Sequence, residues 1–232
     1  MLKRTALSLF LVFFVSIGSI VVSATQHFTL GVTTQSVSEE IKSDIVKSLD
    51  LEILKSEEGR SEIKCFDIST TGMIAIATDT GSISRIYIYD QNGIFQYGYR
   101  FSVDGAYGIG FNGQNLAIYL IRGDIICIVD SSGNCLDIQK IIEPGHHLSK
   151  ELLYRTKKIF EENEYTLERD IGIGDGYSRL VKTDSQNVDV ILYDVTTNHI
   201  IKQIVLILCI VGFFSLCVYG VYQKQRSIEK KE

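Results

Sequence analysis

The sequence predicts a mainly β protein made of antiparallel four-stranded repeats, with two short flanking helices and one or two transmembrane helices. Two observations predict this fold. Short apolar runs alternate with turns rich in Gly, Asn and Asp through the middle of the chain, and a 19-residue run near the carboxyl end carries no charge. The chain has 232 residues, 45% hydrophobic and 22% charged, so it can bury a sizeable core and is not of disordered composition.

Residues 1–24 have the composition of a signal peptide or an N-terminal membrane anchor. Lys3 and Arg4 precede an apolar run over 6–24. Small residues at the end of this run favour cleavage after Ala24, whereas an apolar run of about 17 residues is long enough to span a membrane uncleaved. Both alternatives place the chain that follows on the outer side of the membrane.

Residues 25–60 are expected to contribute an amphipathic helix and a lead-in to the repeats. Ser36 and Glu39 have the spacing of a capping box. Apolar residues then recur every four positions, at Val37, Ile41, Ile45 and Leu49. We expect this helix to pack on the sheet; a helix lying on the membrane surface is the alternative, which a polar face poor in basic residues disfavours.

Residues 61–199 are expected to form an extracytoplasmic β-repeat domain. Up to residue 142 the chain reads as eight short strands in two groups of four, separated by turn sequences in which Gly and Asn tolerate positive φ. The expected strands are 62–68, 73–78, 84–90 and 93–101 in the first group, and 106–112, 115–122, 124–130 and 134–142 in the second.

The two groups share a period of about 40 residues. Asp90 and Gly93 recur as Asp130 and Gly133 at a spacing of 40. Self-similarity at this period, with four strands in each unit, is typical of propeller blades. Over residues 61–142 the strand spacing and the two Asp-x-x-Gly turns resemble β-propeller repeats of the broad NHL or WD type. This resemblance implies that each group is a blade, in an incomplete propeller or an open twisted sheet.

A third, partial group is expected after Pro144 and Gly145 interrupt the pattern. Ser149 can cap a helix over 150–162 with apolar residues along one stripe. Strands are expected at 163–170, 177–184 and 188–195, with a turn at 185–187 joining the last two.

Residues 200–222 are expected to be a transmembrane helix. The uncharged run over 204–222 would form about 28 Å of helix, close to the hydrocarbon thickness of a bilayer. Four basic residues in the tail, 223–232, place the carboxyl terminus in the cytoplasm by the positive-inside rule. The sequence therefore predicts a plasma-membrane protein with its main domain outside, crossing once, or twice if 1–24 is retained.

Charge and cysteine content limit the partners and the covalent chemistry. Six of the 23 basic and two of the 28 acidic residues lie at the two chain ends, so the part between them carries nine net negative charges and no basic cluster for nucleic acid. Outside the membrane segments the cysteines are Cys65, Cys127 and Cys135. Cys127 and Cys135 flank an expected turn and could form a disulfide or remain free thiols, depending on strand register.

The candidate binding surface is a set of alternating aromatic residues in the strand 93–101. They are Phe95, Tyr97, Tyr99 and Phe101, and they could stack on a ligand or bury against a partner. Packing between blades is the more economical use of the same residues.

Three short motifs have weaker functional interpretations. Glu143, His146 and His147 could ligate a metal but fit a solvated loop better. The glycines of 171–176 lack the strand-then-helix context of a phosphate loop. Residues 122–124 spell Arg-Gly-Asp at an expected hairpin tip, resembling integrin-binding loops, although Gly and Asp are also what a tight turn needs.

No Ser, His or carboxylate constellation marks a catalytic site, and no cofactor or metal site is expected. The sequence favours a membrane-anchored extracytoplasmic binding or sensing module that has a protein partner or self-associates and does not bind nucleic acid. A structural subunit that completes its sheet by oligomerisation is the alternative, and a hydrolase without a recognisable signature is the least favoured.

Overall fold

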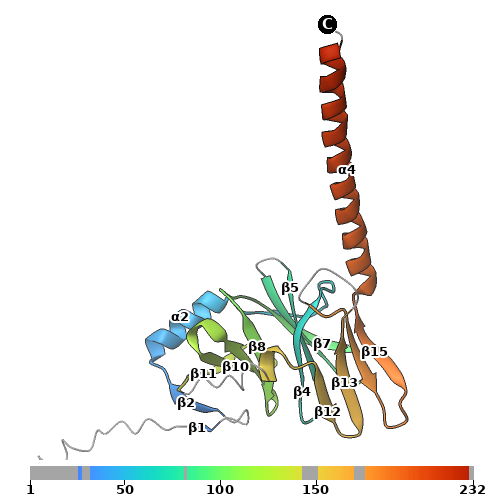
Figure 1. The fold of residues 1–232 in the computed structure, drawn as a ribbon. Helices are drawn as coiled ribbons and strands as arrows, with labels where there is room; N and C mark the ends of the chain where they lie inside the picture. Colours follow the sequence, from blue (N-terminus) through green and yellow to red (C-terminus); the bar gives the residue numbers. More distant parts are fainter. Residues whose placement is uncertain (1–25, 28–31, 81–82, 143–150, 170–175, 230–232) are drawn as a thin grey trace, which may run out of the picture.

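The computed structural model describes residues 26–27, 32–80, 83–142, 151–169 and 176–229, and its fold is mainly β, in three antiparallel sheets with few helices (Figure 1). The expected signal or anchor segment, 1–24, lies outside these residues.

The first sheet contains the first expected group of strands. Consecutive strands pair with one another in an antiparallel meander, and each strand lies within a few residues of its expected position. The strands are β4 (Ile63–Ile68), β5 (Ile74–Thr80), β6 (Ile83–Tyr89) and β7 (Phe95–Ser102). The alternation of apolar residues and turn signals was therefore sufficient to predict these four strands.

The second sheet repeats the same meander. Its strands are β8 (Tyr107–Asn112), β9 (Asn115–Leu120), β10 (Ile125–Val129) and β11 (Cys135–Ile141). The expected strand 115–122 ends at Leu120, because a short 3₁₀ turn, η1 (Ile121–Gly123), follows it. All eight strands of the two expected groups are present.

The third sheet has four strands where the sequence predicted three strands and a helix. Its strands are β12 (Lys157–Phe160), β13 (Asn163–Glu168), β14 (Arg179–Thr183) and β15 (Asp189–Asp194). The expected helix over 150–162 is wrong beyond its start: residues 151–153 are helical, but Lys157–Phe160 pairs with β13. In the turn between β12 and β13, Glu161 adopts φ 55°. The sequence has no Gly or Asn at this position, which would normally indicate such a turn.

The amino-terminal segment covers the outer edges of the first two sheets. Strand β3 (Glu52–Leu54) pairs with β7, and β2 (Thr33–Ser36) pairs with β11 and with the short β1 (Gln26–His27). The described part of the third sheet has no added strand beyond β15.

The expected amphipathic helix exists, but it begins later than its capping signal indicated. Helix α2 (Glu39–Leu49) is capped by Ser38, whose side chain accepts a hydrogen bond from the backbone N–H of Ile41 at 3.4 Å. The predicted cap, Ser36, belongs to β2 instead. Ile45 and Leu49 pack on the core between the first two sheets, whereas Ile41 is 48% exposed.

The sheets pack face to face, with the first sheet in the middle. One apolar core fills the space between the first and second sheets, and a second core, rich in tyrosine, fills the space between the first and third. Strand β4, at one edge of the first sheet, lies beside β8 and β12, which are edge strands of the other two sheets and the first strands of their four-stranded meanders. The first strands of the three repeats therefore meet at one junction.

Four hairpin turns share one hydrogen-bond pattern. Asp90, Asp130 and Asp184 each accept two backbone N–H bonds on Oδ1, from the residues two and four positions later, at 2.8–2.9 Å. Ser69 does the same with its hydroxyl. The fourth turn residue is Gly or Asn at positive φ in every case, which relieves the steric cost of that conformation.

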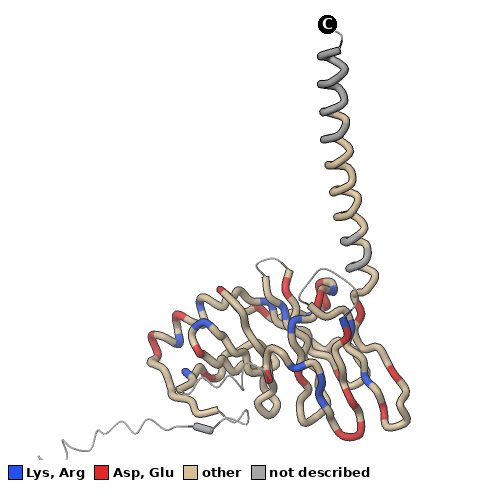
Figure 2. The backbone as a smooth tube through the Cα atoms, viewed as in Figure 1, with Lys and Arg blue, Asp and Glu red and all other residues tan. Residues whose placement is uncertain are grey.

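Helix α4 (Thr196–Glu229) follows β15 directly and points away from the sheets (Figure 1). In Figure 2 charged residues are spread over the sheets, whereas the described middle of α4 carries none. Large apolar side chains between Ile204 and Tyr219 are about half exposed or more. In the described part of the chain, no helix fulfils the length and apolarity that a membrane crossing requires.

Candidate functional site

The four aromatic residues expected to form one surface are divided between two faces of β7. A β-bulge at Gln96 shifts the register, so that Tyr97 pairs with Ile88 but Phe95 pairs with Tyr89. Tyr99 and Phe101 are buried between the first and second sheets, with Tyr97 beside them, whereas Phe95 packs on the core facing the third sheet. These side chains pack sheet against sheet and form no continuous exposed stripe.

Residues 55–61 form a strap that crosses the first sheet on the way from β3 to β4. Three tyrosine hydroxyls hold it. Tyr87 donates to the carbonyl oxygen of Gly59 at 3.0 Å, Tyr89 donates to a Glu57 carboxylate oxygen at 2.8 Å, and Tyr193 of the third sheet donates to the carbonyl oxygen of Ser61 at 2.8 Å. Burial raises the pKa of all three tyrosines, which keeps their hydroxyls protonated as donors.

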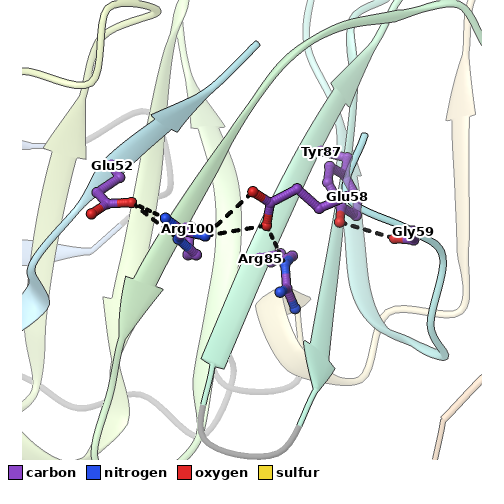
Figure 3. A network of polar contacts seen from close by, with 6 residues as sticks. All are labelled: Glu52, Glu58, Gly59, Arg85, Tyr87 and Arg100. Carbon is purple, nitrogen blue, oxygen red and sulfur yellow. Dashed lines mark hydrogen bonds and ion pairs between the residues drawn. The ribbon is translucent and has the colours of Figure 1, made fainter. Parts of the chain in front are cut away.

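The charges beside the strap neutralise one another (Figure 3). Glu58 accepts from Arg85 at 3.2 Å and from Arg100 at 3.3 Å, and Arg100 also contacts Glu52 on β3. The network ties β3, β6, β7 and the strap together, so we interpret it as a device that holds the strap rather than as a ligand site.

A buried carboxylate joins all three repeats at the junction of their first strands. Asp67 on β4 is 2% exposed. Its carboxylate accepts from the backbone N–H of Phe111 on β8 at 2.8 Å and from Lys158 Nζ on β12 at 2.6 Å, and it forms an ion pair with Arg155. A buried charge is tolerated only when it is paired and hydrogen-bonded, and these partners meet that condition.

A separate cavity of about 450 Å³ lies where the three repeats meet, because its lining comes from all of them. The first repeat contributes Lys64 and Asp79, the second Tyr107, and the third Arg169 and Tyr177. Tyr107 donates to Asp79 Oδ1 at 3.0 Å, and burial raises the pKa of Tyr107 well above its usual value. The Arg169 guanidinium stacks on the Tyr177 ring, 4.9 Å from its centroid.

The cavity is directly connected to the base of α4. Tyr177 and Ile63 exchange two backbone hydrogen bonds of 2.9 Å, which fix the cavity wall to β4. The next residue, Ser178, accepts the backbone N–H of Val195 at 3.0 Å, and Thr196 begins α4. Tyrosine rings, two cationic side chains and one carboxylate line this cavity, so it suits a small ligand or a partner's side chain that combines an apolar part with a polar group.

A larger, more open groove of about 640 Å³ lies between α2 and the sheets and includes part of the Arg-Gly-Asp turn. Arg122 is ion-paired with Asp104, and the Asp124 carboxylate accepts the hydroxyl of Tyr119 at 2.9 Å. Asp124 adopts φ 51° in this turn. Both charged residues of the motif therefore have intramolecular partners.

The remaining candidate motifs fall largely outside the described residues. Glu143, His146 and His147 lie there, as do 171–175. Gly176 is described, and a Cβ added to it would meet the Glu62 side chain at 2.5 Å, so this glycine permits a close approach of two chain segments. Among the described residues there is no group of three or more His, Cys, Asp or Glu that could hold a metal.

Sequence reasoning missed the junction. Asp67 is the single charged residue in the apolar stretch from Cys65 to Ile68, and such a residue in a buried strand signals a buried polar partner. Its partners could not be found in the same way, because Arg155 and Lys158 were assigned to a helix.

No protein-family model matches the chain, and no curated protein matches it.

Proposed function

We propose that this chain is a membrane-anchored extracytoplasmic module that binds a ligand or protein partner in the cavity at the junction of its three repeats, without a catalytic step of its own. In this proposal the three sheets are blades of an incomplete propeller. The module lies outside the plasma membrane, the segment 200–222 crosses the bilayer, and the carboxyl-terminal tail is cytoplasmic.

The connection between the cavity and α4 carries the proposal. Tyr177 lines the cavity, and the adjacent Ser178 accepts the hydrogen bond from Val195 at the start of the helix. A ligand that displaces Tyr177 would therefore shift the base of α4. This arrangement suits a sensing component that passes a signal to another membrane protein.

The anchoring role is supported by the 19-residue uncharged run over 204–222 and by the exposed apolar side chains of α4. An exposed apolar surface of this kind needs lipid or a protein partner to cover it. The four basic residues of the tail favour a cytoplasmic carboxyl terminus.

Sidedness is tested in intact expressing cells with an epitope tag after Glu232. Protease added to the medium is expected to digest the sheet domain while the tag stays protected until lysis. A tag that is digested in intact cells, or a domain that is digested only after lysis, contradicts the proposed topology.

Binding in the cavity is tested with a photo-crosslinking amino acid at Tyr154, which lines the cavity and is 71% exposed. A matched probe at Ile94, which is 60% exposed and lies outside the cavity, is the control. We expect a discrete adduct from position 154 and not from 94. Equal adducts from both positions, or none from 154, would refute the cavity as the binding site.

The uncovered edge of β15 favours one second function, a structural subunit that completes its third sheet with another copy. The corresponding edge strands β7 and β11 are covered by β3 and β2, and uncovered edges promote association. Light scattering on the full chain in detergent would then show a dimer. Ile191→Lys on β15 should dissociate it, whereas Ile159→Lys on β12 should not; a wild-type monomer contradicts this function.

A further inference from the structure

Cys127 and Cys135 form a close pair of thiols across the β10–β11 hairpin. Their sulfur atoms are 3.1 Å apart. A bulge at Leu136 produces this contact: Ile128 pairs with Asp137, but Val129 pairs with Cys135. Without the extra residue, Cys135 would lie opposite Asp130 and point to the other face of the hairpin from Cys127.

The pair is accessible from one side. Cys127 is buried, whereas Cys135 is partly exposed. Both line a cavity of about 240 Å³ between the hairpin and the end of α2, with Lys47 and Asp50 among its other lining residues. A small thiol reagent that enters this cavity would reach Cys135 first.

The third cysteine of the sheets cannot compete for this pairing. Cys65 lies on β4 of the first sheet, is 1% exposed, and belongs to the apolar core between the first two sheets. Burial raises the pKa of its thiol to about 12, so its reactive thiolate form is scarce near neutral pH.

We propose that Cys127 and Cys135 are a modification site: a dithiol that exchanges with a disulfide oxidant, such as oxidised glutathione or a disulfide oxidoreductase, to form an intramolecular disulfide. Both cysteines lie on paired strands beside a turn, so the bond forms with little movement of the backbone. The inference concerns the hairpin alone and does not depend on the proposed binding function or on membrane topology.

The exchange proceeds in two steps. The Cys135 thiolate attacks one sulfur of the oxidant, the oxidant's S–S bond breaks, and half of it leaves as a thiol that takes up the proton lost by Cys135. Cys127 then loses its proton and attacks the Cys135 sulfur of this mixed disulfide, releasing the second half as a thiol. In total, two protein thiols lose two electrons and two protons, and one oxidant disulfide becomes two thiols.

A hydrogen bond between the two thiols supports this order of attack. The contact with Cys127 lowers the pKa of Cys135, against the raising effects of burial and of the Asp137 charge; Lys42, ion-paired with Asp137 at 3.8 Å, also lowers it. The same contact and burial raise the pKa of Cys127. Because Cys135 is also the more exposed of the two thiols, it is the attacking group and Cys127 the resolving group.

The test uses the full chain in detergent, reduced, freed of reductant and then treated with excess oxidised glutathione. Peptide mapping after alkylation is expected to show Cys127 joined to Cys135, with the loss of two hydrogen masses, while Cys65 stays reduced. If Cys127 and Cys135 remain fully alkylatable, or if Cys65 is joined to either of them, the proposal is wrong.

Two serine variants separate the roles of the pair. Cys127→Ser should accumulate a stable mixed disulfide of glutathione on Cys135, because its resolving thiol is absent. Cys135→Ser should lose reactivity at Cys127 and gain no adduct. Near-ultraviolet circular dichroism identifies any variant that has lost its packing. Equal glutathione adduct formation in two folded variants would contradict the assigned order.

Discussion

Cys135 in the second sheet occupies the position that Phe95 occupies in the first, 40 residues earlier. Each follows an Asp-x-x-Gly turn, and each is brought onto a new face by a bulge at the next residue, Leu136 or Gln96. In the first sheet the diagonal neighbour is Tyr87, whose ring centroid is 6.0 Å from that of Phe95. The same backbone geometry therefore brings together two aromatic rings in the first sheet and two thiols in the second.

The disulfide should stabilise the fold measurably. Closing the loop 127–135 restricts the unfolded chain, and for a loop of this length the expected gain in the free energy of unfolding is about 2–3 kcal/mol. Urea denaturation of the oxidised and the reduced full chain measures the difference. Once glutathione has been removed, Cys127→Ser should unfold at the same urea concentration with and without reductant. If reductant lowers the stability of this variant as much as that of wild type, another bond is responsible.

Replacement of the buried Asp67 carboxylate should lower the free energy of unfolding more than the loss of an exposed ion pair does. Asp67→Asn keeps the size of the side chain but leaves Arg155 and Lys158 without their buried counter-charge. We expect a loss of about 3–5 kcal/mol in the free energy of unfolding. As the control, Asp104→Asn breaks the exposed pair with Arg122 and should change the free energy of unfolding by less than about 1 kcal/mol. Similar losses in the two variants would show that Asp67 does not hold the junction.

The turn before β5 depends on one buried hydroxyl. Ser69 Oγ accepts from the backbone N–H groups of Thr71 and Met73 at 3.2 and 2.9 Å. Ser69→Ala removes both hydrogen bonds, and we expect a loss of about 1–3 kcal/mol in the free energy of unfolding, measured by urea denaturation. Ser132→Ala, in the corresponding exposed turn of the second sheet, should change stability by no more than about 0.5 kcal/mol.

Gly98 is required by a close approach of strands and not by its backbone angles. A Cβ on Gly98 would lie 2.8 Å from the carbonyl oxygen of Ile86, on the adjacent strand β6. Gly98→Ala should therefore lower the thermal unfolding temperature, with a cost of about 1–3 kcal/mol. Gly212→Ala on α4, where a Cβ would meet nothing within 4 Å, is the matched control and should leave the unfolding of the sheets unchanged.

The turn carboxylate at Asp130 should make stability depend on pH in the acid range. Hydrogen bonds from the Asn134 side chain and backbone, and from the backbone of Ser132, lower the pKa of Asp130. A lowered pKa in the folded state contributes stability that is complete above the unfolded-state pKa and is lost as the pH falls through the folded-state value. Asp130→Asn should flatten this acid dependence in urea titrations at several pH values. Ser132→Ala, which keeps the carboxylate, should retain it.

Local signals predicted most of the strands. The eight strands of the first two sheets follow from alternation and from turns such as Asp90 to Gly93, because both signals lie within a few residues of one another. The capping residue of α2 was displaced because β2 pairs with β11 and takes Ser36 into the sheet. The pattern over 150–162 failed for a similar reason: pairing with β13 determined the structure of Lys157–Phe160 against its local preference.

The candidate site was less predictable than the fold. Its parts come from three repeats, and neither the partners of Asp67 nor the lining of the junction cavity share any spacing in the sequence. The bulges at Gln96 and Leu136 made the faces of the aromatic residues and of the cysteines unpredictable in the same way. A shift of one residue reverses the face on which a side chain lies.

The junction between β15 and α4 has a mechanical consequence. Asp194 accepts the backbone N–H of Thr196 at 2.7 Å, and Val195 is hydrogen-bonded to Ser178. The residues that join the last strand to the helix are therefore held by hydrogen bonds. A rotation of α4 about its own axis would therefore apply a torque to β15 and to the start of β14 together.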